Sequence, residues 1–562
     1  MKGEVEYTVL FLEAFSDFML TLPLAPTSSL ACPAFKDEAS CVHWLGQLQL
    51  TNLQQAHNQL LHQLNVLNSY TMRGLERLNT LEVLYETLCH VQDDFSKKLI
   101  GKPLPLNENE LLIFKAIVQL WQALLTGYQH CLQAHIDGDR QLARHGALLC
   151  QRCLHFKGLE ILEYLRTGYE FGAQLWQQLH ELYAYAEHHD LHEIAVAAPC
   201  SEGTQVQHSC LNSYVITLLA GYAHPAQLTR WQLQHLARWL SLWCANITIS
   251  RTCDIVPDEA QPLAVDLSST QGLQPCGDLP HSDTLRYLIV APLGRLLRAK
   301  TTLLQQGQTP RQLNLGDHYD SPACIELLIF LHQSWCENTR KRQNQRQPIA
   351  KNADLCYKLE GIFAHLSGKP FKQRDHSIDV EASQRVEPFG PELHLAQNKE
   401  LVEMGYPLEN WQMENESVIG VRLSRVDSIG GRFNYKQLVA LRPCDAQAFI
   451  LGTIAWTNVA QNSRLQMGLK YLPGLPEPVS VRSSDLTPST VYAPAFLLPA
   501  LPSLNISNSL ILPRDWFQVD RLIELLYLNG QKCYIRLDAS IERGLDYERV
   551  SYTPAQKNNI TY

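Results

Sequence analysis

The segment Asn415-Glu-Ser417-Val-Ile-Gly420 carries residue types that suit a polar ligand. The Asn415 amide and the Ser417 hydroxyl are short hydrogen-bonding groups. They sit where a turn feeds a predicted strand, Val418–Leu423. Gly420 permits a β-bulge or the close approach of a ligand. The pattern therefore predicts a small binding surface at a strand edge, although a purely structural turn has the same residue types.

The region around this segment is locally basic, although the whole chain has a formal net charge of -9. Such a balance disfavours a nucleic-acid-binding protein, because phosphate binding needs a basic footprint. Between 417 and 482, however, eight basic residues stand against three acidic ones: Arg422, Arg425, Arg432, Lys436, Arg442, Arg464, Lys470 and Arg482 against Asp427, Asp445 and Glu477. A basic face suits a small anionic ligand better than a DNA duplex. The alternative is a solvated strand face that happens to be basic.

Two other clusters have metal-ligand residue types. Cys150-Gln-Arg-Cys153 has the spacing of a zinc or redox pair, but no second pair stands at zinc-finger spacing. His188-His189-x-x-His192-Glu193 is typical of a polar helix end. The chain also lacks Gly-x-x-x-x-Gly-Lys-Ser/Thr, Gly-x-Ser-x-Gly and His-Glu-x-x-His. We therefore expect no metal, no cofactor and no catalysis.

Length and composition set the frame for these groups. A chain of 562 residues should form about three or four domains. Its N-terminus carries Glu4 and Glu6 where an export signal would place Lys or Arg. No apolar run reaches the roughly 18 residues of a membrane span. We expect a cytoplasmic protein with no membrane span, in which the sixteen cysteines are reduced core residues.

Helical periodicity runs from about 38 to 339, after an N-terminal segment, 1–37. Asn107 and Glu110 form an N-terminal capping pair behind a Pro-rich stop. Apolar stripes with spacings of three and four predict stacked helical hairpins. They include Leu111, Phe114, Val118, Trp121 and Leu125, then Leu175 to Glu187, then Leu233, Leu236, Leu240 and Trp243. We interpret the polar stretches 201–215 and 251–283 as surface loops within this helical domain.

The pattern changes to short strands beyond Asn410. Val418–Leu423, Leu438–Leu441, Phe449–Trp456 and Leu465–Tyr471 are apolar and bounded by turn residues, which is typical of a small barrel or sandwich. Further strands are expected around Leu510–Pro513, Arg521–Leu528 and Tyr534–Ile541. The fold class is α+β: a helical array at 38–339, a small antiparallel β-barrel at 340–485 and a β-rich C-terminal extension at 486–562. A Pro- and charge-rich insertion is expected at about 368–410.

The barrel region resembles the PilZ domain family. The resemblance is carried by Trp411 to Gly420, by Gly452-x-x-x-Trp456, and by Met467-Gly-Leu-Lys-Tyr471, in that order. PilZ domains also have an upstream Arg-x-x-x-Arg, matched here by Arg342-Gln-Asn-Gln-Arg346. Arg346 and Asn415 lie 69 positions apart, a wider gap than is usual in that family. An insertion after the first strand accounts for the gap, because loop closure costs grow slowly with length.

This resemblance implies a bacterial receptor for cyclic di-GMP. Arg342 and Arg346 would clamp the ligand, Asn415 and Ser417 would lie beneath it, and Gly420 would keep the floor open. A guanidinium fork matches guanine O6 and N7, stacks on purines and pairs with phosphate. The alternative for the arginines is a cap on the C-terminal end of the helix through Trp335.

The predicted function is that of a signalling receptor or adaptor. Nucleotide occupancy would pass through the helical domain to a protein partner, for example in motility or pilus machinery. A PilZ-like scaffold that acts by protein–protein contact without binding nucleotide is the alternative. An enzyme hidden in the helical domain would need a polar cluster that converges in a pocket.

Overall fold

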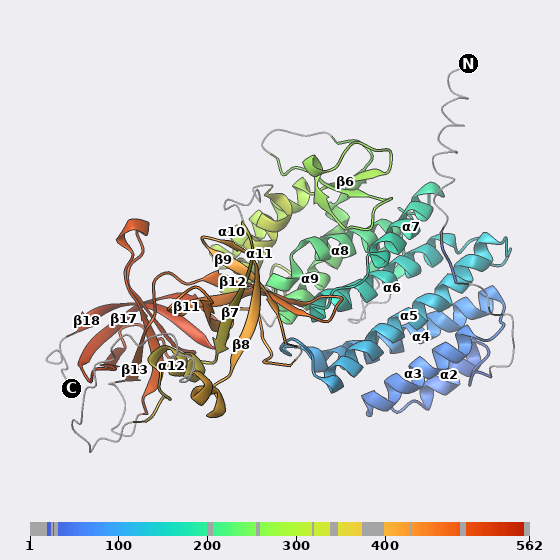
Figure 1. Ribbon diagram of the computed structural model, residues 1–562. Coiled ribbons are helices and arrows are strands. Elements are labelled where there is room, and N and C mark those ends of the chain that lie inside the picture. The colour runs from blue at the N-terminus through green and yellow to red at the C-terminus, as the bar shows by residue number, and fades with distance from the viewer. Residues whose placement is uncertain are drawn as a thin grey trace. The chain divides into compact units, whose positions relative to one another are not determined.

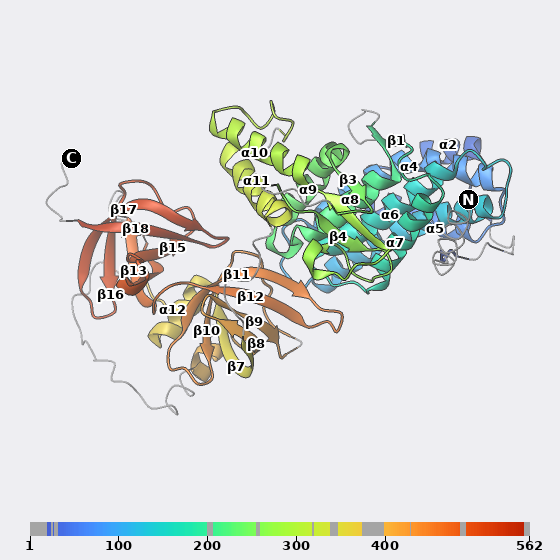
Figure 2. The same cartoon turned by 90° about the horizontal axis from the view of Figure 1, so that it is seen from above.

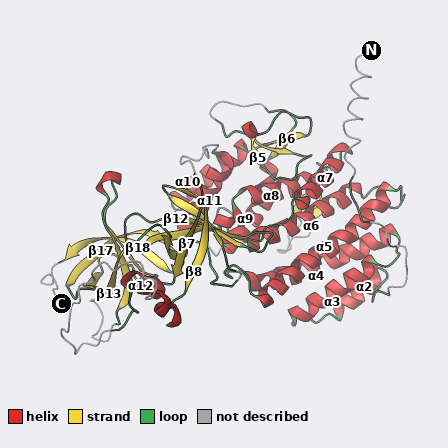
Figure 3. Cartoon of the chain, viewed as in Figure 1, coloured by secondary structure: helices red, strands yellow, loops and turns green. Residues whose placement is uncertain are grey.

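The computed structural model describes residues 20–23, 26, 32–198, 206–253, 259–316, 320–337, 347–373, 398–427, 429–483 and 491–555. The chain divides into two compact units. The first comprises Met1–Lys102 and Leu106–Lys341, and the second comprises Pro103–Pro105 and Arg342–Tyr562. Helices dominate the first unit and strands the second, as the colours in Figure 3 show. The α+β class is therefore confirmed, with helical and β-rich parts in the predicted order.

The first unit is built from long helices that follow one another along the chain (Figure 1). They are α2 (Glu38–Gly46), α3 (Leu53–Asn68), α4 (Gly74–Ser96), α5 (Glu108–Ile136), α6 (Gly146–Thr167), α7 (Gln174–His188), α8 (Cys210–Tyr222), α9 (Arg230–Trp243), α10 (Ala291–Gln305) and α11 (Ser321–Cys336). Most neighbours in sequence pack against each other, for example α5 with α6 and α10 with α11. This pattern is that of stacked hairpins, as predicted.

Helix α5 shows how sequence determines these elements. Asn107 caps it and forms a reciprocal capping box with Glu110, confirming the predicted start. Phe114, Val118 and Trp121 of the predicted stripe are buried. Helix α5 is long and apolar enough to cross a membrane, a property that core helices of globular proteins share. In this structure 56% of its most apolar 18-residue stretch is buried within the protein. The stripe therefore packs as the core face of this unit.

Short strands interrupt the helices where surface loops were predicted. β1 (Val196–Ala198) pairs with β2 (Val206–His208). The prediction of a loop at 201–215 was therefore wrong for β2 and for residues 210–215, which begin α8. A second sheet has the order β3-β6-β4-β5, from Thr248–Ser250, Leu285–Ile289, Leu263–Asp266 and Gln274–Pro275. The prediction of loops at 251–283 was wrong for β4 and β5. These strands are too short to show alternation, and Pro262 and Asp266 on either side of the buried run Leu263–Val265 gave it the look of a loop.

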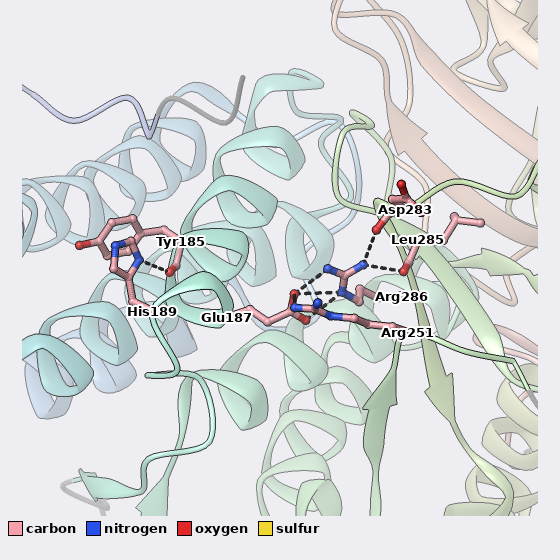
Figure 4. Close-up of polar contacts among 7 residues, drawn as sticks. All are labelled: Tyr185, Glu187, His189, Arg251, Asp283, Leu285 and Arg286. Carbon is pink, nitrogen blue, oxygen red and sulfur yellow. Dashed lines mark hydrogen bonds and ion pairs between the residues drawn. The ribbon is translucent and has the colours of Figure 1, made fainter. Parts of the chain in front are cut away.

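A buried ion pair joins this small sheet to α7 (Figure 4). Arg286 of β6 donates from Nε to Glu187 Oε1 at 2.8 Å and from Nη2 to Oε2 at 2.6 Å. Its Nη1 donates to the carbonyls of Asp283 and Leu285, and Arg251 Nη2 also donates to Glu187 Oε2. Burial opposes ionisation of Glu187, but the two guanidinium groups hold its pKa below the ordinary value. Glu187 and Arg286 hold each other, and two backbone carbonyls hold Arg286, so we assign this cluster a structural role.

The second unit contains a first closed barrel with the strand order β10-β11-β12-β9-β8-β7 (Figure 2). Its strands are β7 (Gln347–Tyr357), β8 (Leu408–Ser417), β9 (Gly420–Arg425), β10 (Leu438–Pro443), β11 (Ile450–Val459) and β12 (Leu465–Tyr471). All neighbouring pairs are antiparallel. Helix α12 (Leu359–Ser367) follows β7 and ends just before the insertion predicted at about 368–410. The last residues of that predicted range belong to β8, which begins at Leu408.

The C-terminal part is a second closed barrel, with the order β13-β14-β15-β18-β17-β16. Its strands are β13 (Glu477–Ser483), β14 (Ala493–Leu498), β15 (Ser509–Pro513), β16 (Leu522–Tyr527), β17 (Lys532–Arg543) and β18 (Tyr547–Ala555). β13 pairs with β14 and β16, so it belongs to this barrel although it lies within the range 340–485 predicted for the first. Only a turn at Pro473-Gly474 separates β12 from β13, which conceals the boundary in the sequence.

The two barrels share one hydrophobic core within the second unit. Phe363 of α12 and Leu451 of β11 pack in one cluster with Phe496 and Ile511 of the second barrel. Tyr547 belongs to the same cluster, and its hydroxyl lies 2.7 Å from Thr453 Oγ1 in β11. The apolar surface buried between the barrels predicts that they unfold together.

Candidate binding surface on the first barrel

The predicted Asn415–Gly420 segment forms a tight β-hairpin. β8 ends at Ser417, β9 begins at Gly420, and the two turn residues Val418 and Ile419 are exposed. Ser417 pairs with Gly420, and its hydroxyl donates to the Gly420 carbonyl at 3.2 Å. The predicted start of the strand at Val418 was therefore wrong by two residues. β8 is also paired on both sides, so the segment does not lie at a sheet edge.

A β-bulge at Glu414 decides which way this segment faces. Trp411 and Met413 of β8 are buried, and Met413 pairs with Leu423 in the barrel interior. The next pair is Asn415 with Arg422, so Glu414 is an extra residue on β8. Because side chains alternate along a strand, one extra residue moves those that follow to the opposite face. The bulge thereby turns Asn415 to the outer face with Arg422, and Ser417, two residues on, follows.

A cross-strand row extends from Asn415 over the outer face. Arg422 of β9 pairs with Gly468 of β12, and Gly468 pairs with Trp456 of β11. A Cβ on Gly468 would lie 2.0 Å from the Trp456 Nε1, so the indole lies directly over this glycine. The Arg422 Cζ lies 5.7 Å from the Trp456 ring centroid, within range of a cation–π contact. The row therefore places an aromatic face and a guanidinium beside Asn415.

Carboxylates from β8 hold the polar groups of this surface. Arg422 Nε lies 2.7 Å from Glu414 Oε2, and Arg422 Nη2 donates to Gln466 Oε1 at 3.0 Å. On the other side of the segment, the Tyr471 hydroxyl donates to Glu416 Oε1 at 2.7 Å. Burial, together with this carboxylate, raises the pKa of Tyr471 above its ordinary value. The bulge residue thus pairs with the guanidinium nearest to Asn415.

Gly420 is required by the close approach of two strands. A Cβ at this position would lie 2.1 Å from the backbone oxygen of Leu469 in β12. Such a contact is far below van der Waals distance, and a backbone atom cannot move aside as a flexible side chain can. The sequence predicted a bulge or the close approach of a ligand at Gly420, whereas the structure shows the bulge at Glu414 and the close approach of strand β12. Whether Gly420 also leaves room for a ligand stays a prediction.

The predicted arginine pair, Arg342 and Arg346, lies outside the described residues. The chain is described again at Gln347, the residue after Arg346, where β7 begins. Gln347 pairs with Glu416, and Pro348 pairs with Asn415. Although Arg346 and Asn415 lie 69 positions apart, antiparallel pairing therefore brings the start of β7 next to the end of β8. The sequence of the arginine pair leads directly into the partner strand of the Asn415–Gly420 segment.

The predicted basic face is not one continuous surface. Arg425 is buried beside Glu409, Arg442 pairs with Asp354 at 2.8 Å, and Arg482 lies in the second barrel. The count of charges between 417 and 482 missed these carboxylates because strand pairing brings them from outside that window. What remains at the candidate surface is Arg422 with the exposed Lys470, which pairs with Gly420.

Cys150 and Cys153, which have the spacing of a zinc or redox pair, lie on helix α6 with both thiols buried. Burial raises the pKa of Cys150 to about 12, which disfavours the thiolate that metal binding and redox chemistry require. Nearby, burial lowers the pKa of His155 to about 3. Over the described ranges, no three His, Cys, Asp or Glu side chains converge as a metal site would need.

Sequence reasoning missed Glu414 and Gln466 as parts of this surface, and it named Arg422 only as one of eight basic residues between 417 and 482. A signal existed for Arg422, which lies two residues beyond Gly420 and so on the same strand face. The bulge at Glu414 left no signal, because a bulge depends on pairing with a neighbouring strand. Trp456 was noted only as part of a resemblance, not as a contact of Arg422.

Comparisons with known proteins match both ends of the chain. Residues 39–254 match the family of the N-terminal domain of the cyclic-di-GMP receptor FimW, and residues 479–555 match the FimW C-terminal β-barrel domain. The second range coincides closely with β13–β18. The cyclic-di-GMP receptor FimW of Pseudomonas aeruginosa is 22% identical over 543 residues, covering 87% of this chain and 86% of that protein. At both ends, in their order, and over most of its length, this chain is similar to the cyclic-di-GMP receptor FimW.

Proposed function

We propose that this chain is a signalling receptor that binds cyclic di-GMP on the outer face of its first barrel. The observation that carries the proposal is the pairing of Gln347 and Pro348 with Glu416 and Asn415. It ties the residue after Arg346 to the hairpin that presents Asn415 and Ser417. The similarity to a protein named as a cyclic-di-GMP receptor supports the same ligand.

The chemistry of the ligand fits the groups available. Cyclic di-GMP has two guanines and two phosphates, so it needs both flat cationic groups and short hydrogen-bonding groups. Arg342 and Arg346 would supply guanidinium forks for guanine edges or phosphate. Asn415 and Ser417 would hydrogen-bond from the barrel face. On this proposal the first barrel, which lies in the stretch 255–478 between the two matched ranges, is a PilZ-like barrel.

Signal transmission would use the same segment. Residues 337–346 lie between helix α11 and strand β7 in the chain, so a ligand held by Arg342 and Arg346 would restrain the link between the two units. A ligand biases a conformational equilibrium only through its different affinity for two states. We propose that the helical unit then contacts a protein partner, and that the chain acts by binding without catalysing a reaction.

Calorimetric titration of the full-length protein with cyclic di-GMP tests the binding half of this proposal. We expect saturable binding at micromolar nucleotide and none with GMP at the same concentration. A folded protein that takes up no cyclic di-GMP would favour the alternative of a scaffold acting by protein contact. Hydrogen exchange with and without nucleotide tests the second half, with slower exchange expected at 338–346.

A further inference from the structure

A third arginine stands next to the proposed ligand groups on the barrel face. Arg422 pairs directly with Asn415 across β8 and β9, and the bulge at Glu414 sets both side chains on the outer face. Directly paired residues have Cβ atoms about 5 Å apart. A ligand that hydrogen-bonds Asn415 would therefore lie within reach of the Arg422 guanidinium.

The Arg422 side chain is partly exposed and is held by contacts with its neighbours. Its side chain is 37% exposed, and it rests against Trp456 and donates to Gln466. A guanidinium stacked on an aromatic ring is pre-organised, so less rotamer entropy is lost when it binds a further group. These contacts leave it oriented at the surface beside Asn415.

The Glu414 carboxylate occupies the position that an anion would take. It lies 2.7 Å from Arg422 Nε and is itself 30% exposed. An ion pair at a partly exposed site contributes little net free energy, so an incoming phosphate can replace it. The carboxylate also repels that phosphate, because two negative groups would share one guanidinium.

We infer that Arg422 is a further ligand-binding residue and that Glu414 competes with the nucleotide phosphate for it. This inference rests on the proposed function, since it concerns the same surface. The Glu414–Arg422 pair sets the affinity: the receptor binds nucleotide less tightly than its arginines alone would allow. This competition concerns nucleotides, whose phosphates would bind Arg422, and does not apply to a neutral nucleoside.

The test is calorimetric titration with cyclic di-GMP of full-length wild type, Glu414→Gln, Arg422→Ala and the double variant. Glu414→Gln removes the competing charge and should tighten binding roughly threefold or more, an effect that added salt should diminish. Arg422→Ala should weaken binding about tenfold, as expected for loss of one charge-assisted hydrogen bond. In the double variant the gain in affinity from Glu414→Gln should vanish, because no Arg422 guanidinium remains that could be freed from the carboxylate to bind phosphate.

A matched control comes from the same barrel. Asp354 of β7 pairs with Arg442 of β10 at 2.8 Å, at the other end of β7 from Gln347. Asp354→Asn removes a similar ion pair and should leave affinity unchanged. Thermal unfolding of each variant checks that the barrel is folded. Arg422→Lys keeps the positive charge but loses the planar guanidinium, and it should bind with an affinity between those of wild type and Arg422→Ala.

The outcomes separate this inference from the proposed function. If wild type binds and both Glu414→Gln and Arg422→Ala match it, Glu414 and Arg422 have only a structural role and the inference is overturned. If Glu414→Gln weakens binding, the competition is wrong. If neither wild type nor Glu414→Gln binds cyclic di-GMP, the proposed function fails, and the inference fails with it.

Discussion

Gln347 at the start of β7 lies opposite Glu416 near the end of β8, although 69 positions separate the two residues. The two strands run antiparallel, so the first residues of β7 and the last residues of β8 lie at the same end of the barrel. This relationship brings the chain just after Arg346 to the hairpin of Asn415 and Ser417. The entropic cost of closing a loop grows slowly with its length, so the long connection between β7 and β8 is compatible with this pairing.

Removing the hydrogen-bonding groups of the hairpin should lower ligand affinity without unfolding the barrel. We expect Asn415→Ala and Ser417→Ala each to weaken cyclic di-GMP binding by roughly tenfold, the effect of losing one hydrogen bond to a charged or polar ligand group. Calorimetry measures the affinity, and the thermal midpoint should stay close to that of wild type. Asn352→Ala, at an exposed position of β7, is the control. Equal affinity of all three variants with wild type would remove the hairpin from the site.

A side chain at Gly420 should destabilise the barrel. In Gly420→Ala the new Cβ meets the Leu469 carbonyl oxygen of β12, and β9 must shift, which should cost about 1–3 kcal/mol in the free energy of unfolding. Urea unfolding followed by fluorescence measures this. Gly361→Ala in α12, where nothing lies within 4 Å, should instead be neutral or stabilising by up to about 1 kcal/mol. Equal stability of the two variants would contradict the close approach of β9 and β12.

The two barrels should unfold as one cooperative unit. Tyr547 joins them through Thr453 and also donates to Glu542 at 2.9 Å, so Tyr547→Phe should lower the free energy of unfolding by about 1–3 kcal/mol. Tyr552→Phe, on the same strand β18, serves as the control. A fragment with residues 347–555 should show one transition by both fluorescence and circular dichroism. Two separate transitions would mean that the shared core does not couple the barrels.

The helical unit should lose stability in mild acid. Burial lowers the pKa of His57 and of His180 to about 4, from an ordinary value of 6.5. Between these values the unfolded chain binds more protons than the folded one, so the free energy of unfolding falls as the pH drops from 6.5 toward 4. Above 6.5 the contribution is fully present. Urea unfolding followed by circular dichroism at several pH values measures the slope.

The contribution of His57 to the acid effect can be isolated by substitution. His57→Gln should reduce the slope of stability against pH, leaving the part due to His180, whereas His62→Gln, at an exposed position of the same helix α3, should leave the slope unchanged. A slope in His57→Gln identical to that of wild type would show that His57 does not titrate in this way.

Much of the fold follows from local patterns in the sequence. The capping pair Asn107 and Glu110 and the stripe of α5 determine that helix, because both signals lie within a few residues of each other. β12 was predicted with its observed ends because Leu465 and Tyr471 are bounded by turn residues. Local patterns cannot show which strands pair, so the assignment of β13 to the second barrel needed the structure.

The candidate surface was predictable only in part, for the same reason. Asn415, Ser417 and Gly420 could be singled out by type and spacing, and the structure brings them together in one hairpin. Their outward direction depends on the bulge at Glu414, and the pairing of Arg422 with that residue depends on the register of β8 and β9. Both are properties of strand pairing, not of the segment itself.

The central claim is that Arg342 and Arg346 bind cyclic di-GMP over the hairpin that ends β8. The most direct measurement is calorimetric titration of the Arg342→Ala, Arg346→Ala variant beside wild type. Arg140 and Arg144, exposed in the helical unit at the same spacing, provide the matched control pair. We predict that binding is lost in the first variant and unchanged in Arg140→Ala, Arg144→Ala. Undiminished binding after removal of Arg342 and Arg346 would contradict the account.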